Sequence, residues 1–262
     1  MKPDIFESKF KEFIKELKEY TTCGNTNEWK IKGFIDIDKN IFTISTDTKL
    51  VSKILELHVF PKISKFAEDN GFNLILPNSQ NYYPDLTFEF KTNKKIKYAV
   101  DIKTTFVREN TKNYCDFTLG SHGAYFEDRD SKKNIQFPYN QYKGHFVLGI
   151  VYNQRNDIDE TKSYEIKDLD KIISVINNLK FFFIEKWKIA TDRQGSGNTA
   201  NIGGLLKKES DMENGNGIFR NEEEFDDFWI NYNKISIIDK NGNDKKIKRI
   251  EELREYRGIN KK

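Results

Sequence analysis

The spacing of apolar residues predicts a helix at the start of the chain and a second helix shortly after it. Phenylalanine, isoleucine and leucine recur every three or four positions over residues 5–20, which places them on one face of an amphipathic helix. A second helix is expected to begin at a cap formed by Asp47 or Thr46, and Pro61 should kink or restart it. Further helices are expected over residues 167–179, from the capping-box residue Asn221 through Trp229, and over 250–256.

Alternation of apolar and polar residues predicts strands in much of the remaining chain. A small hairpin is expected within residues 31–44, where Gly33 and Asn40 interrupt two short alternating runs. Longer strands are expected at 72–76, 86–90, 96–106, 146–153, 163–166 and 181–190. Strands interleaved with helices predict an α/β or α+β fold, and the lack of repeats or a strong linker predicts one domain over residues 1–262 with a smaller appendage.

Composition narrows the class of protein but not its function. A chain of 262 residues with 37% hydrophobic and 14% aromatic residues is long and apolar enough to fold around a full core. Cys23 and Cys115 form neither a disulfide framework nor a zinc-binding pattern, which favours a reducing cytoplasm. We expect no signal peptide and no membrane span. The net charge of +3 is compatible with a polyanion partner only if the positive potential is confined to one cleft.

The strongest candidate for chemistry is Pro84-Asp85 followed by Asp101-Ile102-Lys103. Residues i and i+2 of a strand share a face, so Asp101 and Lys103 should point the same way. Asp85 should open the neighbouring strand, and a hairpin through residues 91–97 would bring the three side chains together. Two carboxylates and an ammonium in one cleft can build a Mg²⁺ site that hydrolyses phosphodiesters. The residues alone are equally compatible with an ordinary Asp/Lys pair on a solvated strand face. Glu56, on the preceding helix, is either a third carboxylate or a solvated helix residue.

A glycine-rich loop forms the second candidate site. Gly195, Gly197 and Ala200 superficially fit a dinucleotide-binding fingerprint, but no helix or suitably placed acid follows them. Asparagine can pair with the adenine edge and a threonine methyl group can contact thymine, so a Gly/Asn/Thr loop suits the DNA major groove. The alternative is a turn-rich surface loop. Ser79-Gln80-Asn81 is a similar polar patch with the same alternative.

Eight segments, taken in order, together resemble a known enzyme family. They are Asp47-Thr48-Lys49, Asn81-Tyr82-Tyr83-Pro84-Asp85, Asp101-Ile102-Lys103-Thr104-Thr105, Phe117-Thr118-Leu119-Gly120, Gly195-Ser196-Gly197-Asn198-Thr199, Asn201-Ile202-Gly203, Gly217-Ile218-Phe219 and Tyr256-Arg257-Gly258. In order and spacing they resemble the EcoRV family of type II restriction endonucleases over nearly the whole chain.

The resemblance implies a fold, an activity and partners. The fold is the PD-(D/E)XK nuclease core, a central mixed β-sheet flanked by helices, with a small dimerisation subdomain around residues 20–45 and a DNA-recognition region around residues 191–204. The activity is Mg²⁺-dependent cleavage of both strands of a palindromic duplex to blunt ends, with Mn²⁺ as a substitute. The partners are double-stranded DNA and a second copy of the chain, without a nucleotide cofactor or a membrane, in a bacterial cytoplasm.

The resemblance also implies roles for individual residues. Asp85 and Asp101 match the metal-binding carboxylates, Lys103 matches the catalytic lysine, and Glu56 falls where the accessory acid of the family lies. The implied DNA contacts are Gln80 and Asn81 in the minor groove, Thr104, Thr105 and Lys133 on phosphates, and Gly195, Ser196, Gly197, Asn198, Thr199 and Asn201 in or beside the major groove.

Two departures stand in these loops, where the family has threonine at the position of Ala200 and glutamine at that of Ser79. The N-terminal part and residues 239–248 also match poorly. Because the main base-reading residues are retained, GATATC cut at its centre is the expected site. The competing hypotheses are a repair or recombination nuclease of the same fold with relaxed specificity, and a catalytically silent sequence-specific DNA-binding protein.

Overall fold

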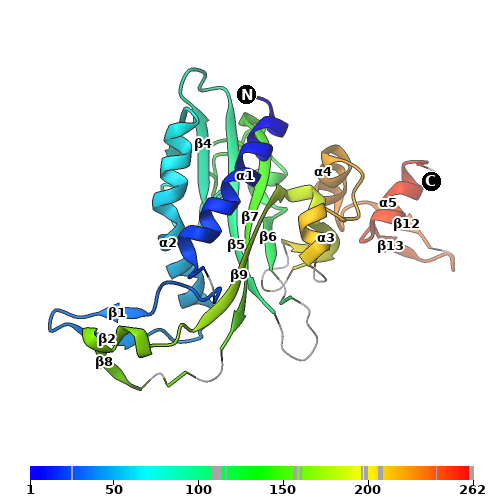
Figure 1. The fold of residues 1–262 in the computed structure, drawn as a ribbon. Coiled ribbons are helices and arrows are strands. Elements are labelled where there is room, and N and C mark those ends of the chain that lie inside the picture. Colours follow the sequence, from blue (N-terminus) through cyan, green and yellow to red (C-terminus); the bar gives the residue numbers. More distant parts are fainter. Residues whose placement is uncertain are drawn as a thin grey trace.

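A five-stranded mixed sheet forms the centre of the computed structural model (Figure 1). The structure describes residues 1–262 except 25, 108–113, 116, 156–157, 160, 196, 198–199, 206–208, 240 and 260–262. In spatial order the strands are β3 (Phe72–Ile75), β4 (Leu86–Phe90), β5 (Lys97–Phe106), β7 (Tyr142–Gln154) and β9 (Ile176–Glu185). The pair β5–β7 is parallel and the other neighbours are antiparallel. The expected α+β class with a central mixed sheet is therefore confirmed.

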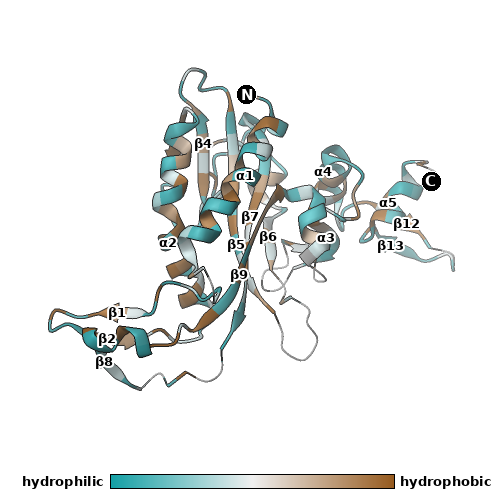
Figure 2. Cartoon of the chain, viewed as in Figure 1, coloured by the Kyte–Doolittle hydropathy of each residue, from teal (hydrophilic) through white to brown (hydrophobic). Residues whose placement is uncertain are grey.

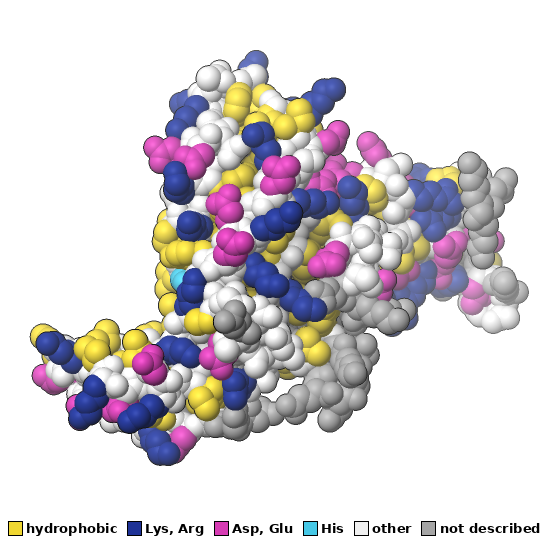
Figure 3. All heavy atoms as spheres, viewed as in Figure 1, with side chains coloured by type: hydrophobic (Ala, Val, Ile, Leu, Met, Phe, Trp, Pro, Cys, Tyr) yellow, Lys and Arg dark blue, Asp and Glu magenta, His cyan; other side chains and the backbone are white. Residues whose placement is uncertain are grey.

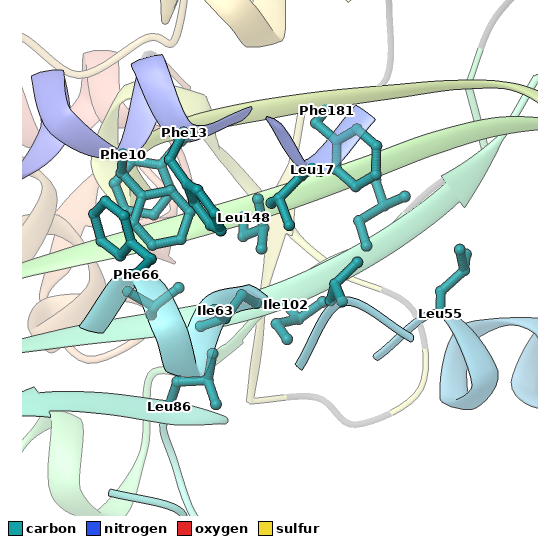
Figure 4. Packing of buried hydrophobic residues seen from close by; sticks show 14 of the residues in the cluster. Phe10, Phe13, Leu17, Leu55, Ile63, Phe66, Leu86, Ile102, Leu148 and Phe181 are labelled. Carbon is teal, nitrogen blue, oxygen red and sulfur yellow. The ribbon is translucent and has the colours of Figure 1, made fainter. Parts of the chain in front are cut away.

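Two long helices, α1 (Pro3–Thr21) and α2 (Thr48–Asp69), pack against one face of this sheet. The core between them is aromatic (Figure 4): Phe10 stacks on Phe183 with ring centroids 4.0 Å apart, and Phe13 stacks on Phe66 at 4.6 Å. On the outer face that α1 covers, basic and acidic side chains are interspersed, as on an ordinary solvated surface (Figure 3). None of the described helices is long and apolar enough to span a membrane.

The predicted N-cap of α2 and the proline inside this helix have different outcomes in the structure. The Asp47 side chain accepts hydrogen bonds of 3.0 Å from the backbone N–H groups of Lys49 and Leu50, so the predicted N-cap is confirmed. Pro61 does not restart the helix, which continues to Asp69. Proline removes only the hydrogen bond to the carbonyl of Leu57, a residue that is 63% exposed and accessible to water.

The opposite face of the central sheet carries a second apolar cluster and a group of short elements. A three-stranded sheet of order β10–β11–β6 is built from β6 (Thr118–Ser121), β10 (Ala190–Gln194) and β11 (Asn201–Gly204). Beside it lie α3 (Glu209–Asn214), α4 (Glu222–Asn231), the hairpin β12 (Ser236–Ile238) and β13 (Asp244–Lys246), and α5 (Ile250–Tyr256). The chain also contains the 3₁₀ helices η1 (Ala124–Phe126), η2 (Tyr139–Gln141), η3 (Ile166–Lys171) and η4 (Lys186–Ile189).

A small sheet projects from one end of the molecule. The expected hairpin is confirmed as β1 (Gly33–Ile35) and β2 (Asn40–Thr43), and β8 (Ser163–Glu165) joins it from a distant part of the chain. Hydrophobic residues remain at the surface of this β1–β2–β8 sheet (Figure 2), among them Phe34, Ile35 and Ile37, which are 47%, 59% and 95% exposed.

One helix and one strand boundary were predicted wrongly. Residues 167–179 do not form an α-helix: η3 ends at Lys171 and β9 begins at Ile176. The strand expected at 181–190 is this β9, which ends at Glu185. Pairing of Ile176 and Phe181 with Gln154 and Ile150 of β7 overrides the helical spacing of the apolar residues, because it buries them in the central sheet.

Candidate active site

Two adjacent central strands bring the predicted acidic residues together. β4 and β5 pair antiparallel with Leu86 opposite Val100, so Asp85, immediately before β4, lies beside the strand segment that carries Asp101. One Asp85 carboxylate oxygen accepts a 2.7 Å hydrogen bond from the backbone N–H of Ile102. The hairpin predicted from the sequence is thus confirmed, and it places Asp85 against the Asp101–Lys103 segment.

Side chains alternate between the two faces of β5, so the candidate catalytic residues and the core residues lie on opposite faces. Val100 and Ile102 are buried in the cluster beneath α1 and α2, where Figure 4 shows Ile102 among apolar neighbours. Asp101 and Lys103 share the opposite face, as predicted, and the Lys103 Nζ lies 2.7 Å from an Asp101 carboxylate oxygen. The hydrophobic packing of one face therefore holds the charged side chains of the other in register.

Burial and mutual repulsion set the protonation of the pair of carboxylates. Burial, and then the charge of Asp101, raise the pKa of Asp85 to about 7. Burial also acts to raise the pKa of Asp101, but the Lys103 and Lys186 ammonium groups act together against it and the net pKa of Asp101 is lowered. For Lys103, burial is outweighed by Asp101 and Asp85, so its pKa is raised and it remains a cation. The site therefore has more carboxylate charge than Lys103 alone neutralises.

The three side chains open into a cleft of about 330 Å³. Besides Asp85, Asp101 and Lys103, its lining includes Gln80 and Asn81 from the segment before β4 and Ser121 from β6. Gln80 and Asn81 are exposed, so both can reach a ligand in the cleft. Residues that the sequence pattern treated as separate candidates thus share one cavity.

Glu56 lies on α2, outside that lining. Its carboxylate pairs with Lys53 at 2.7 Å and is 31% exposed, yet its charge acts on Asp85 and Lys103 and raises the pKa of both. In the part of the chain that the structure describes, no three His, Cys, Asp or Glu residues are grouped closely enough to hold a metal ion together. Glu56 is therefore within electrostatic reach of the site but is not assembled with the two aspartates.

The implied phosphate contacts occupy two places. Thr104 and Thr105 line a separate hollow with Thr48 and Lys49 at the start of α2. The Thr104 hydroxyl is hydrogen-bonded to that of Ser52, and the Thr105 hydroxyl donates a 2.7 Å bond to the Cys115 carbonyl. A phosphate at Thr105 would therefore need a donor other than that proton. Lys133 is exposed, one residue before the cleft residue Asn134.

The glycine-rich loop connects β10 to β11, and Ser196, Asn198 and Thr199 lie outside the described residues. Its base is closed by a 2.8 Å hydrogen bond from the Gly195 N–H to the Asn201 carbonyl. A Cβ at Gly195 would lie 2.6 Å from the Thr118 methyl carbon, and Gly197 has a φ of +90°, so both positions favour glycine. Asn201 is paired with the cleft residue Ser121, which links the base of the loop to the acidic site.

Sequence reasoning missed two groups at this site. Ser121 lies on β6, a four-residue strand with no recognisable alternation. Lys186 is buried beneath the cleft, although it comes 83 residues after Lys103. No local sequence signal distinguishes it from the other lysines, because its surroundings are supplied by distant strands.

Two comparisons with known proteins give matches over most of the chain. The family model described as restriction endonuclease EcoRV matches residues 25–258. The type II restriction enzyme EcoRV of Escherichia coli is 38% identical over 213 residues, which covers 80% of this chain and 85% of that enzyme.

Proposed function

Since the chain belongs to the EcoRV family of type II restriction endonucleases, we propose that it cuts both strands of GATATC at the centre and leaves blunt ends. The observation that carries the catalytic part of this proposal is the single cleft that holds Asp85, Asp101 and Lys103 with Gln80, Asn81 and Ser121. A bacterial cytoplasm is the proposed compartment, since the E. coli relative is a bacterial enzyme.

The chemistry of the cleft fits a divalent cation. Asp85 and Asp101 supply hard oxygen ligands, and Mg²⁺ typically takes one or two carboxylates and completes its shell with water and phosphate oxygens. The surroundings of Asp85 support this assignment, because burial, and then the charge of Asp101, penalise the ionised Asp85 carboxylate, and a bound cation would offset that penalty. We propose Asp85 and Asp101 as ligands of Mg²⁺, which Mn²⁺ could replace, with Glu56 as an accessory acid. When bound, the ion supplies Lewis-acid stabilisation of phosphate charge and a more acidic water.

The protein groups then have separate tasks. The Ile102 N–H orients the Asp85 carboxylate, and the Lys103 ammonium holds one oxygen of Asp101 at 2.7 Å. Asp101 and Asp85 outweigh burial and raise the pKa of Lys103, so we assign its ammonium as a donor to a phosphate oxygen. Cleavage requires water to attack phosphorus and the sugar oxygen to leave, so a fixed cation beside the phosphate lowers the barrier.

Sequence readout is proposed to come from both sides of this cleft. Gln80 and Asn81 are proposed for the minor groove, and the loop of Gly195, Ser196, Gly197, Asn198 and Thr199, with Asn201, for the major groove. Thr104, Thr105 and Lys133 are proposed to contact phosphates. Support comes from the Asn201–Ser121 pairing, which joins the base of the loop to the cleft. Through this pairing, a change in the loop on binding the correct bases would affect the arrangement of the carboxylates.

The proposed assembly is a twofold dimer that uses the region around residues 20–45. One chain has one Asp85/Asp101/Lys103 set, whereas cleavage of two antiparallel strands at symmetric positions requires two. The β1–β2–β8 sheet supports this assignment because, together with the adjoining η3 and the segment before β1, it lines a groove of about 720 Å³. The apolar side chains in this groove are Ile31, Phe34, Ile35, Ile41, Ile166 and Leu169. A second copy would remove this apolar surface from water.

Mapping of cleavage ends tests the proposal. Purified protein is incubated with Mg²⁺ and a sequenced plasmid that has one GATATC, and both ends are sequenced. Blunt ends at the centre of GATATC are expected. Ends at another palindrome would overturn the proposed site, scattered ends would indicate the relaxed repair or recombination nuclease, and binding without cleavage would indicate a silent DNA-binding protein.

A further inference from the structure

Lys186 is a buried cation that no step described so far uses. It is the first residue after β9, and it is 2% exposed. Within the described residues its Nζ has no hydrogen-bond partner. An ammonium group that leaves water without such partners carries a large desolvation penalty. The rings of Tyr83, Phe126 and Phe225, with centroids 5.1, 5.6 and 6.0 Å from the Nζ, offset part of that penalty by cation–π contact.

The geometry places this ammonium directly under the cleft. The Lys186 Nζ lies 5.1 Å from the ring centroid of Tyr83 and 3.7 Å from where a Cβ on Gly120 would be. Tyr83 and Gly120 both line the cleft that holds Asp101. Across the sheet Asp101 is aligned with Val147 and then with Ile184, two residues before Lys186. The side chain of Lys186 therefore reaches the floor of the active site from the far edge of the sheet.

Charged groups from several elements surround Lys186. Asp101 of β5 and Asp226 of α4 favour its charged form, whereas Lys103 and Arg129 oppose it. His145 of β7 also experiences its charge, and burial and the Lys186 ammonium lower the pKa of that imidazole. Burial lowers the pKa of Lys186 itself to about 8, although Asp101 opposes this effect, so Lys186 remains largely protonated at neutral pH.

The cleft needs more positive charge than Lys103 provides. Asp85 and Asp101 already repel each other, and DNA brings a phosphodiester into the same space. A fixed ammonium beneath them acts through a poorly screened interior, where charge interactions are stronger than in water. We propose that Lys186 is a positioning residue that supplies this charge and stabilises ionised Asp101 from beneath the cleft. The inference depends on the active site assigned under the proposed function.

A double-mutant cycle in the metal-free protein tests the coupling. Urea unfolding is measured in EDTA at pH 7 for wild type, Lys186→Met, Asp101→Asn and the double variant. Met keeps the unbranched apolar stem and removes the charge. The effect of Lys186→Met on the unfolding equilibrium constant is compared in two backgrounds. With Asp101 present, we expect the increase to be larger than in the Asp101→Asn background by a factor of about five or more. Lys97→Met is the matched control, because Lys97 is also buried in the sheet but pairs with Glu89. It should be additive with Asp101→Asn.

The pH profile of cleavage provides a second readout that a purely structural role would not change. Without the ammonium, ionised carboxylates in the cleft are less stable, so the acid limb of kcat/KM for Lys186→Met should move to higher pH by about 0.5 or more. Lys186→Arg, which keeps the charge, should restore the limb toward its wild-type position.

Additive effects of Lys186→Met and Asp101→Asn, or an unmoved acid limb, would overturn the inference. The stability cycle requires no cleavage, so its failure is distinguishable from failure of the proposed function. If the proposed function itself were wrong, Asp101 variants would cut DNA normally.

Discussion

The Asp85 carboxylate accepts a 2.7 Å hydrogen bond from the backbone N–H of Ile102, the residue between Asp101 and Lys103. Because this N–H belongs to a central strand, the sheet rather than a mobile side chain determines where Asp85 points. Burial, and then the charge of nearby Asp101, raise the pKa of Asp85 to about 7, although this hydrogen bond acts in the opposite direction. A cation bound beside Asp85 would therefore stabilise its ionised form.

In the metal-free protein, the stability that Asp85→Asn gains over wild type should be larger at pH 8 than at pH 5. The folded pKa of about 7 lies above the ordinary value of 3.8, so ionising Asp85 destabilises the native state. The penalty is absent below pH 4, develops between pH 4 and 7, and is complete above pH 7. Its upper limit is about 4 kcal/mol. Urea unfolding in EDTA at both pH values measures the difference.

Asp244→Asn is the control for this experiment, because Asp244 is exposed on β13. It should change stability equally at both pH values. Addition of Mg²⁺ at pH 8 should stabilise wild type and have less effect on Asp85→Asn. A stability difference between wild type and Asp85→Asn that does not vary with pH would contradict the assigned electrostatics.

The sequence pattern predicted the central elements of the site because they are local. Asp101 and Lys103 share a face as a consequence of strand periodicity, and only residues 91–96 connect the two strands of the hairpin that brings Asp85 to them. Lys186 could not be predicted in this way. Its position depends on the pairing of β5, β7 and the edge strand β9, and its neighbours Tyr83 and Gly120 come from far earlier in the chain.

The contrast between local and long-range contacts also explains the errors in the predicted secondary structure. The long helices α1 and α2 were predictable from apolar spacing, and the cap at Asp47 from its chemistry. Residues 167–179 also show helix-like spacing, but the last of them, from Ile176, pair with β7 as the start of β9. The short β12–β13 hairpin has largely exposed, polar residues at 244–246, so no hydrophobic alternation marks its second strand.

Asn198→Ala should nearly silence cleavage of the cognate site. Loss of a bidentate contact to adenine is expected to cost about 1–3 kcal/mol of discrimination at that base pair. Non-specific binding should persist with its salt dependence almost unchanged, since it relies on phosphate contacts. Cleavage rates and salt-dependent binding on GATATC duplexes measure both effects.

N6-methylation of the contacted adenine should block the wild-type enzyme in the same manner, because the methyl group removes a donor and fills the groove. If Asn198→Ala still cuts at the wild-type rate, the loop does not read the sequence.

The protein should sediment as a dimer, and Ile35→Glu should weaken that dimer. Ile35 is 59% exposed on the β1–β2–β8 sheet, and a carboxylate there would be desolvated by a second copy. Ile238→Glu is a matched control, because Ile238 is 73% exposed on the distant β12. Sedimentation should detect dissociation at higher concentration only for Ile35→Glu. A wild-type monomer both alone and on cognate duplex would rule out the proposed assembly.

The central claim is that the cleft of Asp85, Asp101 and Lys103 hydrolyses DNA. Its most direct test is the single-turnover cleavage rate of Asp101→Ala on a GATATC duplex in Mg²⁺, with Asp128→Ala as a control at an exposed position. The account predicts a loss of about 10³-fold or more for Asp101→Ala, because the electrostatic group is removed while the apolar packing of β5 remains. Asp128→Ala should cut normally, and both variants should keep the wild-type circular dichroism spectrum. An Asp101→Ala enzyme that cuts at near the wild-type rate would show that the catalytic site lies elsewhere.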